Sequence, residues 1–140
     1  MDYDQLESMS EVWKDVMERH LSMFEDLDRP PECGDGWAVL VETLMEAIEQ
    51  VIFESNEQVS LCVTEIKEKH GVLRFVAEVK CSEEEAQDRI KELIAEAEAN
   101  SCGTCKLCGE PGSIRSDRPW IETLCEYHAS RDHDHEAEIY

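Results

Sequence analysis

Hydrophobic positions recur every three or four residues along the first part of the chain, which is the period of an amphipathic helix. Between Tyr3 and Leu27 the apolar positions that follow this period are Leu6, Met9, Trp13, Val16, Met17, Leu21, Phe24 and Leu27. The pattern predicts one helix of about seven turns at 3.6 residues per turn. Prolines and glycines in 28–36 then end it, and Asp35 is suited to cap a following helix over 37–52.

After Asn56 the period changes to two, as expected for strands with one buried face. The positions that share a face are Val59, Leu61 and Val63, and then, beyond a turn at Lys69, His70 and Gly71, they are Leu73, Phe75, Ala77 and Val79. We therefore predict an antiparallel hairpin. A capping box between Ser82 and Glu85 predicts that a third helix opens there and ends near Asn100.

Four residues beyond this helix have the spacing of metal ligands. Cys105 and Cys108 form a CxxC pair, and Cys125 and His128 form a CxxH pair after an intervening segment in which short strands are expected over 113–115 and 120–124. Three thiolates and one imidazole satisfy the tetrahedral coordination that zinc prefers. Because four protein ligands close the site, we expect a structural Zn²⁺ ion that has no position left for activating water.

Cys102 leaves an alternative open. Cys102, Cys105 and Cys108 also have the spacing of an iron–sulfur run, with Cys125 as a fourth ligand. The closing Cys-Pro of such a run is absent, and His128 would have no role, so zinc is the preferred interpretation.

Together these elements predict an α+β fold, in which helices pack on a short antiparallel β-hairpin and a zinc ribbon or knuckle follows at the C-terminus. The expected divisions are an acidic amphipathic helix over 1–30, a helix–hairpin–helix core over 31–100, a zinc-binding module over 101–129 and a disordered acidic tail over 130–140. His133 and His135 could chelate a metal, but a disordered polar tail is the better interpretation.

Composition adds a strong negative charge. The 140 residues include 13 Lys plus Arg against 34 Asp plus Glu, giving a formal net charge of −21. This balance argues against direct binding to nucleic acid or to an anionic membrane, and indicates solvation or a basic protein partner. With no long apolar run and an odd total of 7 cysteines, we expect a cytoplasmic protein that holds a metal and not a disulfide scaffold.

Several motifs together resemble a family of small bacterial and phage proteins without an established activity. They are Gly36-Trp37, the hairpin sequence from Val63 to Phe75, and Cys105-x-x-Cys-Gly-Glu-Pro-Gly112 followed by Trp120-x-x-x-Leu-Cys-x-x-His128. The family has the same order of a Gly-Trp helix, a KEKFGxLRF hairpin, a helix and a zinc motif, although His70 stands where the family tends to have Phe. The resemblance spans 34–128 and implies metal binding. If the chain is phage-encoded, we expect the protein in the cytoplasm of the host cell.

The acidic helices support the main functional hypothesis. Rows of carboxylates on the first and third helices are expected to imitate nucleic-acid phosphates and to occupy the basic groove of a nuclease, effector complex or toxin. Nucleic-acid-mimicking anti-defence and toxin-immunity proteins provide the analogy. The expected partner-binding residues are Asp15, Glu18, Glu25, Glu84, Asp88 and Glu92. The alternative interpretation of the same residues is an ordinary solvated face.

Other functions are weighed against this one. In the second hypothesis the zinc module contacts nucleic acid or a regulatory partner directly, through Lys106, Arg115, Arg118 and Trp120. A zinc enzyme is a distant third, because no Ser/His/Asp order, P-loop or dinucleotide motif is present, and we expect no enzyme. The long Met and Trp stripe of the first helix also makes a homodimer through that helix possible.

Overall fold

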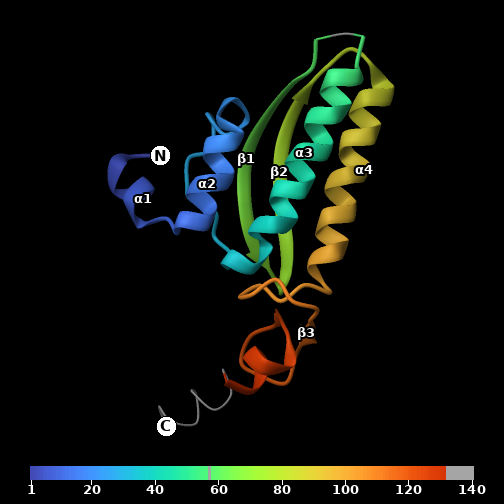
Figure 1. Cartoon of the computed structure of the whole chain (residues 1–140). Coiled ribbons are helices and arrows are strands. Elements are labelled where there is room, and N and C mark those ends of the chain that lie inside the picture. Colours follow the sequence, from blue (N-terminus) through green and yellow to red (C-terminus); the bar gives the residue numbers. More distant parts are fainter. Residues whose placement is uncertain (57, 132–140) are drawn as a thin grey trace.

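The protein is built on a two-stranded hairpin with two long helices along one face and the cysteine-rich segment at one end (Figure 1). The computed structural model describes residues 1–56 and 58–131. Strand β1 (Ser60–Lys69) pairs antiparallel with β2 (Val72–Lys80), and α3 (Ala38–Glu54) runs antiparallel to α4 (Glu84–Ser101). The predicted α+β fold is confirmed. The tail residues His133 and His135 lie outside the described residues.

The hairpin follows its sequence pattern except at one point. His70 and Gly71 have φ values of 53° and 81°, the left-handed conformations that a tight two-residue turn requires. A register shift between Val63 and Glu65 marks a bulge, after which Ile66 takes the buried face. The strict period of two therefore breaks where β1 carries an extra residue, which the sequence pattern alone does not reveal.

The prediction of one continuous helix up to Leu27 is wrong. The segment forms α1 (Tyr3–Ser8), α2 (Glu11–Arg19) and a single 3-10 turn, η1 (Leu21–Met23). The reason for the first break is local: Ser10 accepts a hydrogen bond from the backbone N–H of Trp13 at 3.4 Å and so acts as the N-cap of α2.

Most of the apolar stripe of this segment is nevertheless buried within the chain, and of its residues only Leu6 and Leu21 are exposed. The core residues that it supplies are Met9, Trp13, Val16, Met17, Met23, Phe24 and Leu27. They join the same core as the inner faces of α3, α4 and the hairpin. Because a single chain already covers most of the stripe, no second copy is needed to bury it, and dimerisation stays a prediction.

Two predicted helix caps do not form. Asp35 lies in a 3-10 turn, η2 (Asp35–Trp37), and its carboxylate accepts a hydrogen bond from the Ser10 hydroxyl at 2.8 Å. Helix α4 begins after Glu83, with no side-chain cap, so the predicted box between Ser82 and Glu85 is absent. Tertiary partners compete with the local caps here, since Ser55 donates a hydrogen bond of 2.7 Å to the Glu83 carboxylate.

The cysteine-rich segment forms a second, smaller unit below the hairpin. Strand β3 (Ser113–Arg115) pairs antiparallel with β4 (Glu122–Leu124), which begins two residues later than expected. Its own core is small and contains Cys105, Leu124 and Ala129. Within the part of the chain that the structure describes, no helix is both long and apolar enough to cross a membrane.

Candidate metal centre

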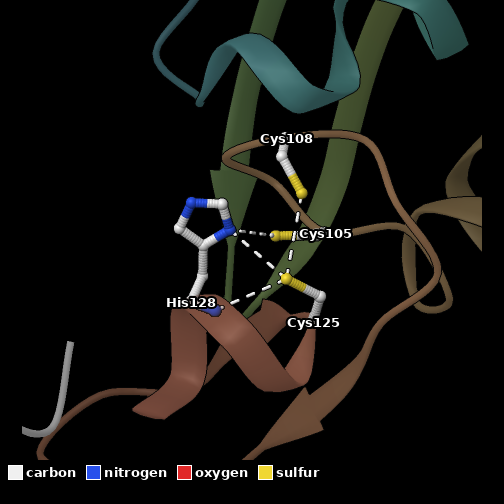
Figure 2. A group of neighbouring side chains, drawn as sticks. All are labelled: Cys105, Cys108, Cys125 and His128. Carbon is white, nitrogen blue, oxygen red and sulfur yellow. Dashed lines mark hydrogen bonds between the residues drawn. The ribbon is translucent and has the colours of Figure 1, made fainter. Parts of the chain in front are cut away.

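The four predicted ligands converge at the end of the molecule below the hairpin (Figure 2). Cys105 and Cys108 lie on the turn that follows α4, Cys125 follows β4 directly, and His128 lies on the helical turn over 126–131. The His128 Nδ1 atom lies 3.6 Å from the sulfur of Cys105 and 3.3 Å from that of Cys125. The sulfurs of Cys108 and Cys125 are 3.8 Å apart, and all four ligand atoms lie within 4.8 Å of one another.

These separations fit a tetrahedral zinc site. With Zn–S bonds of about 2.3 Å and a Zn–N bond of about 2.0–2.1 Å, tetrahedral angles place two sulfurs about 3.8 Å apart and a sulfur and nitrogen about 3.6 Å apart. The observed distances of 3.8, 3.6 and 3.3 Å are close to these values. The Cys3His donor set and its spacing therefore fit a metal such as zinc, and four protein ligands leave no open position.

The turn that carries the first two ligands is fixed by its backbone. Gly109 has φ of 81°, a conformation that favours glycine, and its N–H donates a hydrogen bond of 2.9 Å to the Cys105 carbonyl oxygen. The Cys105 N–H in turn donates to the carbonyl oxygen of Glu110 at 2.8 Å. On the other ligand pair, the N–H of His128 points at the Cys125 sulfur at 3.4 Å.

Backbone N–H groups favour the thiolate form of Cys105. Burial raises the pKa of Cys105, but hydrogen bonds from the N–H groups of Cys125, Cys108 and Leu107 outweigh it and lower the pKa to about 6. For Cys108 the N–H of Glu110 lowers the pKa, but burial and the neighbouring thiols of Cys105 and Cys125 together raise it by more, so the pKa is raised overall. Cys105 therefore forms a thiolate before Cys108, and a bound cation would favour the ionised form of both.

Cys102 lies outside this group of four. Its sulfur contacts the carbonyl oxygen of Glu98, one turn back on α4, at 4.0 Å. Among the described residues, His128 and not Cys102 completes the cluster. The geometry therefore favours a Cys3His site over the iron–sulfur alternative.

The Gly-Trp motif holds this unit against the main core. The Trp37 side chain is fully buried, and its indole N–H donates a hydrogen bond of 2.9 Å to the carbonyl oxygen of Thr104. At Gly36 the two backbones touch: the N–H donates to the Lys106 carbonyl at 2.8 Å, and a Cβ atom would lie 2.2 Å from the carbonyl oxygen of Cys105. The glycine is thus required by close backbone approach.

A second set of contacts joins the hairpin tip to the ligand segment, and sequence reasoning missed it. The Thr123 hydroxyl donates a hydrogen bond of 2.7 Å to the carbonyl oxygen of Gly71 at the turn. Lys106, inside the CxxC pair, places its Nζ 3.0 Å from the carboxylate of Glu68 on β1 and 2.6 Å from that of Glu122 on β4. Partners so distant along the chain leave no periodic signal that could have revealed them.

The basic residues of the second functional hypothesis, in which the zinc module contacts nucleic acid directly, have partners within the chain. Burial lowers the pKa of Lys106, but its hydrogen bonds with Glu122 and Glu68 raise it more, so the lysine is charged and compensated. The nearly buried guanidinium of Arg118 lies 3.7 Å from Glu122, while Arg115 donates to the Leu124 carbonyl at 3.3 Å. The cations predicted to face a nucleic acid are thus engaged within the chain.

The predicted partner-binding acids are all exposed. They are Asp15 and Glu18 on α2, Glu25 after η1, and Glu84, Asp88 and Glu92 on α4. Figure 1 places α2 and α4 on opposite sides of α3, so the two groups do not form one continuous row. Of the six, Glu92 has a described ion pair, with Arg89 at 3.3 Å.

No family model, no curated protein and no solved structure matches the chain. The resemblance to small bacterial and phage proteins thus stays a prediction that depends on the motifs themselves. Function has to be argued from the site and the surface.

Proposed function

We propose that the protein is a zinc-stabilised binding protein, an inhibitor or adaptor whose acidic helices engage the basic surface of a nucleic-acid-handling protein. Such partners include a nuclease, an effector complex or a toxin, and the resemblance to bacterial and phage proteins agrees with an anti-defence or toxin-immunity setting. The observation that carries the proposal is the net negative charge of the exposed helix faces.

Helix α4 provides the most regular acidic row. Glu84, Asp88 and Glu92 are spaced four residues apart, so they lie on one face at intervals of about 6 Å. The sequence of α4 contains six acids against Arg89 and Lys91, and that of α3 contains four acids and no lysine or arginine. A surface of this kind attracts a basic partner over long range and repels nucleic acid and anionic lipid.

The metal has a structural part in this proposal. The core of the ligand segment is too small to fold by burial alone, and zinc binding to such peptides supplies about 10–16 kcal/mol. Because four protein ligands fill the coordination sphere, the metal has no open position at which to activate water. By holding Thr104 and Lys106 in place, the site keeps η2 and the hairpin tip docked, and so positions α3 and α4 on the hairpin.

The test compares two variants with the same change in charge. Glu84→Gln, Asp88→Asn and Glu92→Gln remove the α4 row, and Glu78→Gln, Glu110→Gln and Glu126→Gln remove three exposed acids elsewhere. The immobilised chains are used to capture proteins from a bacterial lysate at low salt, and affinities for a captured basic protein are measured at rising salt. A matching triple variant at Asp15, Glu18 and Glu25 tests α2 in the same way.

We expect capture of a nucleic-acid-handling protein, with affinity that falls steeply with salt and falls further in the α4 or α2 variant than in the control. Capture of no such protein, or equal affinity in all variants, would overturn the proposal. A gel shift of nucleic acid by the chain alone at low salt would instead support the direct-binding hypothesis.

A further inference from the structure

The outer face of the α3–α4 pair carries an apolar groove that the metal centre does not use. It has a volume of about 300 Å³ and reaches the cysteine-rich segment at Thr104 and Gly109. The lining residues that matter here are Val39, Thr43 and Ala47 from α3, and Leu93, Ala97 and Asn100 from α4. Figure 1 shows the two helices side by side, with this pair forming the layer in front of the hairpin.

The α3 side of the groove exposes apolar surface. Val39 is 73% exposed although it opens a helix whose opposite face is fully buried. Phe53, two heptads further along α3, is 85% exposed. A single exposed valine is ordinary, but this one borders a groove whose walls also include the apolar side chains of Leu40, Leu44 and Leu93.

Carboxylates follow both edges of the groove. On α4, Glu96 is part of the lining, and Glu92 precedes it by one turn on the same side. On α3, exposed Glu46 lies one turn beyond Thr43. Since α3 has no cationic residue, the apolar floor lies between two acidic edges.

We infer that this groove binds a basic amphipathic helix of a protein partner. The inference rests on the proposed function and narrows it to one surface and one kind of ligand. The apolar side of such a helix would enter the groove, and its lysines and arginines would pair with the carboxylates at the edges. From Val39 to Ala47 the groove is about 12 Å long, and the line to Phe53 adds about 9 Å, which together match about four helical turns.

Charge and burial argue against a second copy of the chain as occupant. Most of the apolar stripe of the N-terminal segment is already buried in its own core. The segment is also acidic, so placing it in the groove would oppose like charges.

The test uses a synthetic Leu–Lys peptide of about 14 residues, with leucines spaced to form one helical face. A peptide of the same composition in scrambled order is the control for charge alone. Binding of both to the zinc-loaded chain is measured by titration calorimetry at physiological salt. The key variant is Val39→Asp with Thr43→Asp, which removes groove surface while making the protein more acidic.

If the groove binds the helix, the patterned peptide should bind more tightly than the scrambled one. The groove variant should weaken binding of the patterned peptide by about tenfold or more, because a few central contacts carry most of the binding energy of such an interface. Attraction by charge alone predicts the opposite, because the variant carries two more negative charges. Val12→Asp with Leu21→Asp is the matched control: it adds the same charge at exposed apolar positions near α2, and it should bind like the wild type. Zinc content and helicity are checked in every variant. If the double variant loses its fold, Val39→Asp alone replaces it, because that side chain is 73% exposed.

Several outcomes would overturn the inference. They are equal binding of the two peptides, wild-type affinity in the groove variant, or a loss confined to the α2 control. Self-association of the wild type that the groove variant abolishes would identify a second copy as the occupant instead. The proposed function is tested separately. If the groove variant binds the peptide normally but the Glu84, Asp88 and Glu92 variant still loses a basic partner, the groove inference is wrong and the proposed function is supported.

Discussion

The indole nitrogen of Trp37 donates a 2.9 Å hydrogen bond to the carbonyl oxygen of Thr104, 67 residues further along the chain. The donor belongs to a side chain with no solvent exposure at the start of α3, and the acceptor immediately precedes the first metal ligand. The bond therefore joins the main core to the metal centre, and the stability of each should depend on the other.

Replacing Trp37 with Phe should lower the free energy of unfolding by about 2–4 kcal/mol, because it leaves a buried carbonyl without a donor and a void beside it. Urea unfolding of the zinc-loaded protein measures the loss. Trp120→Phe is the control, since that side chain is 57% exposed, and it should change stability by less than about 0.5 kcal/mol. Equal effects of the two substitutions would show that the Trp37 contact does not join the units.

Gly36→Ala should prevent normal docking of the cysteine-rich segment. The added Cβ would meet backbone atoms of Cys105, Gly109 and Lys106 at 2.2–2.6 Å, and backbone cannot move aside as a flexible side chain can. We expect a loss of several kcal/mol, at least about 3, as for other overpacked or strained sites. At Gly103 the nearest atom is 3.9 Å away, so Gly103→Ala should be tolerated, and thermal unfolding of the two variants makes the comparison.

The metal centre predicts one tightly bound zinc ion per chain. Cys105→Ser and His128→Ala should each lose it, whereas Cys102→Ser should retain it, because Cys102 lies outside the ligand group. Metal analysis gives the stoichiometry, and Co²⁺ substitution should give the visible spectrum of a tetrahedral thiolate site. A brown protein that loses its colour in Cys102→Ser would instead show an iron–sulfur cluster.

Cys33 predicts a pH dependence of stability. Burial, and then the charges of Glu68 and Asp35, raise the pKa of its thiol to about 12 against an opposing effect of Lys106. The unfolded chain therefore ionises this thiol first, near pH 9, so the stabilisation is complete below pH 9 and is lost as the pH rises toward 12. Cys33→Ser should remove this part of the alkaline slope in urea unfolding.

The same thiol should resist alkylation. At pH 8 a thiol with a pKa near 12 is ionised in about one molecule in ten thousand, against about one in ten for an ordinary cysteine. Peptide mapping after iodoacetamide treatment should therefore find Cys33 modified only after unfolding. Rapid modification in the folded protein would contradict the burial.

The sequence was most informative where structure is local. The ligand positions Cys105, Cys108, Cys125 and His128 follow from coordination chemistry, which fixes both residue types and spacing. Helix α3, helix α4 and the hairpin follow from periodic burial, since every turn or alternate residue must face one core. Periodicity failed between Leu6 and Trp13, because the apolar spacing continues through a break that the Ser10 cap imposes.

What the sequence could not provide was the set of contacts that crosses the chain. Asp35 and Ser55 have local signals for caps or turns, but the structure uses both for distant partners. The need for glycine at position 36 is visible only when the Cys105 backbone is placed against it. Such preferences depend on tertiary packing, which overrides local propensity.

The ion pairs of Lys106 constrain how the sequence can change during evolution. Its ammonium group joins Glu68 of the hairpin to Glu122 of β4, and the three side chains are only 15%, 19% and 7% exposed. Replacing Lys106 alone would remove the cation that Glu68 and Glu122 share, at a cost of about 3–5 kcal/mol. Positions 68, 106 and 122 should therefore vary together among descendants of this sequence. A cysteine-rich segment grafted from another chain would have to carry charges at positions 106 and 122 that match Glu68 of the hairpin.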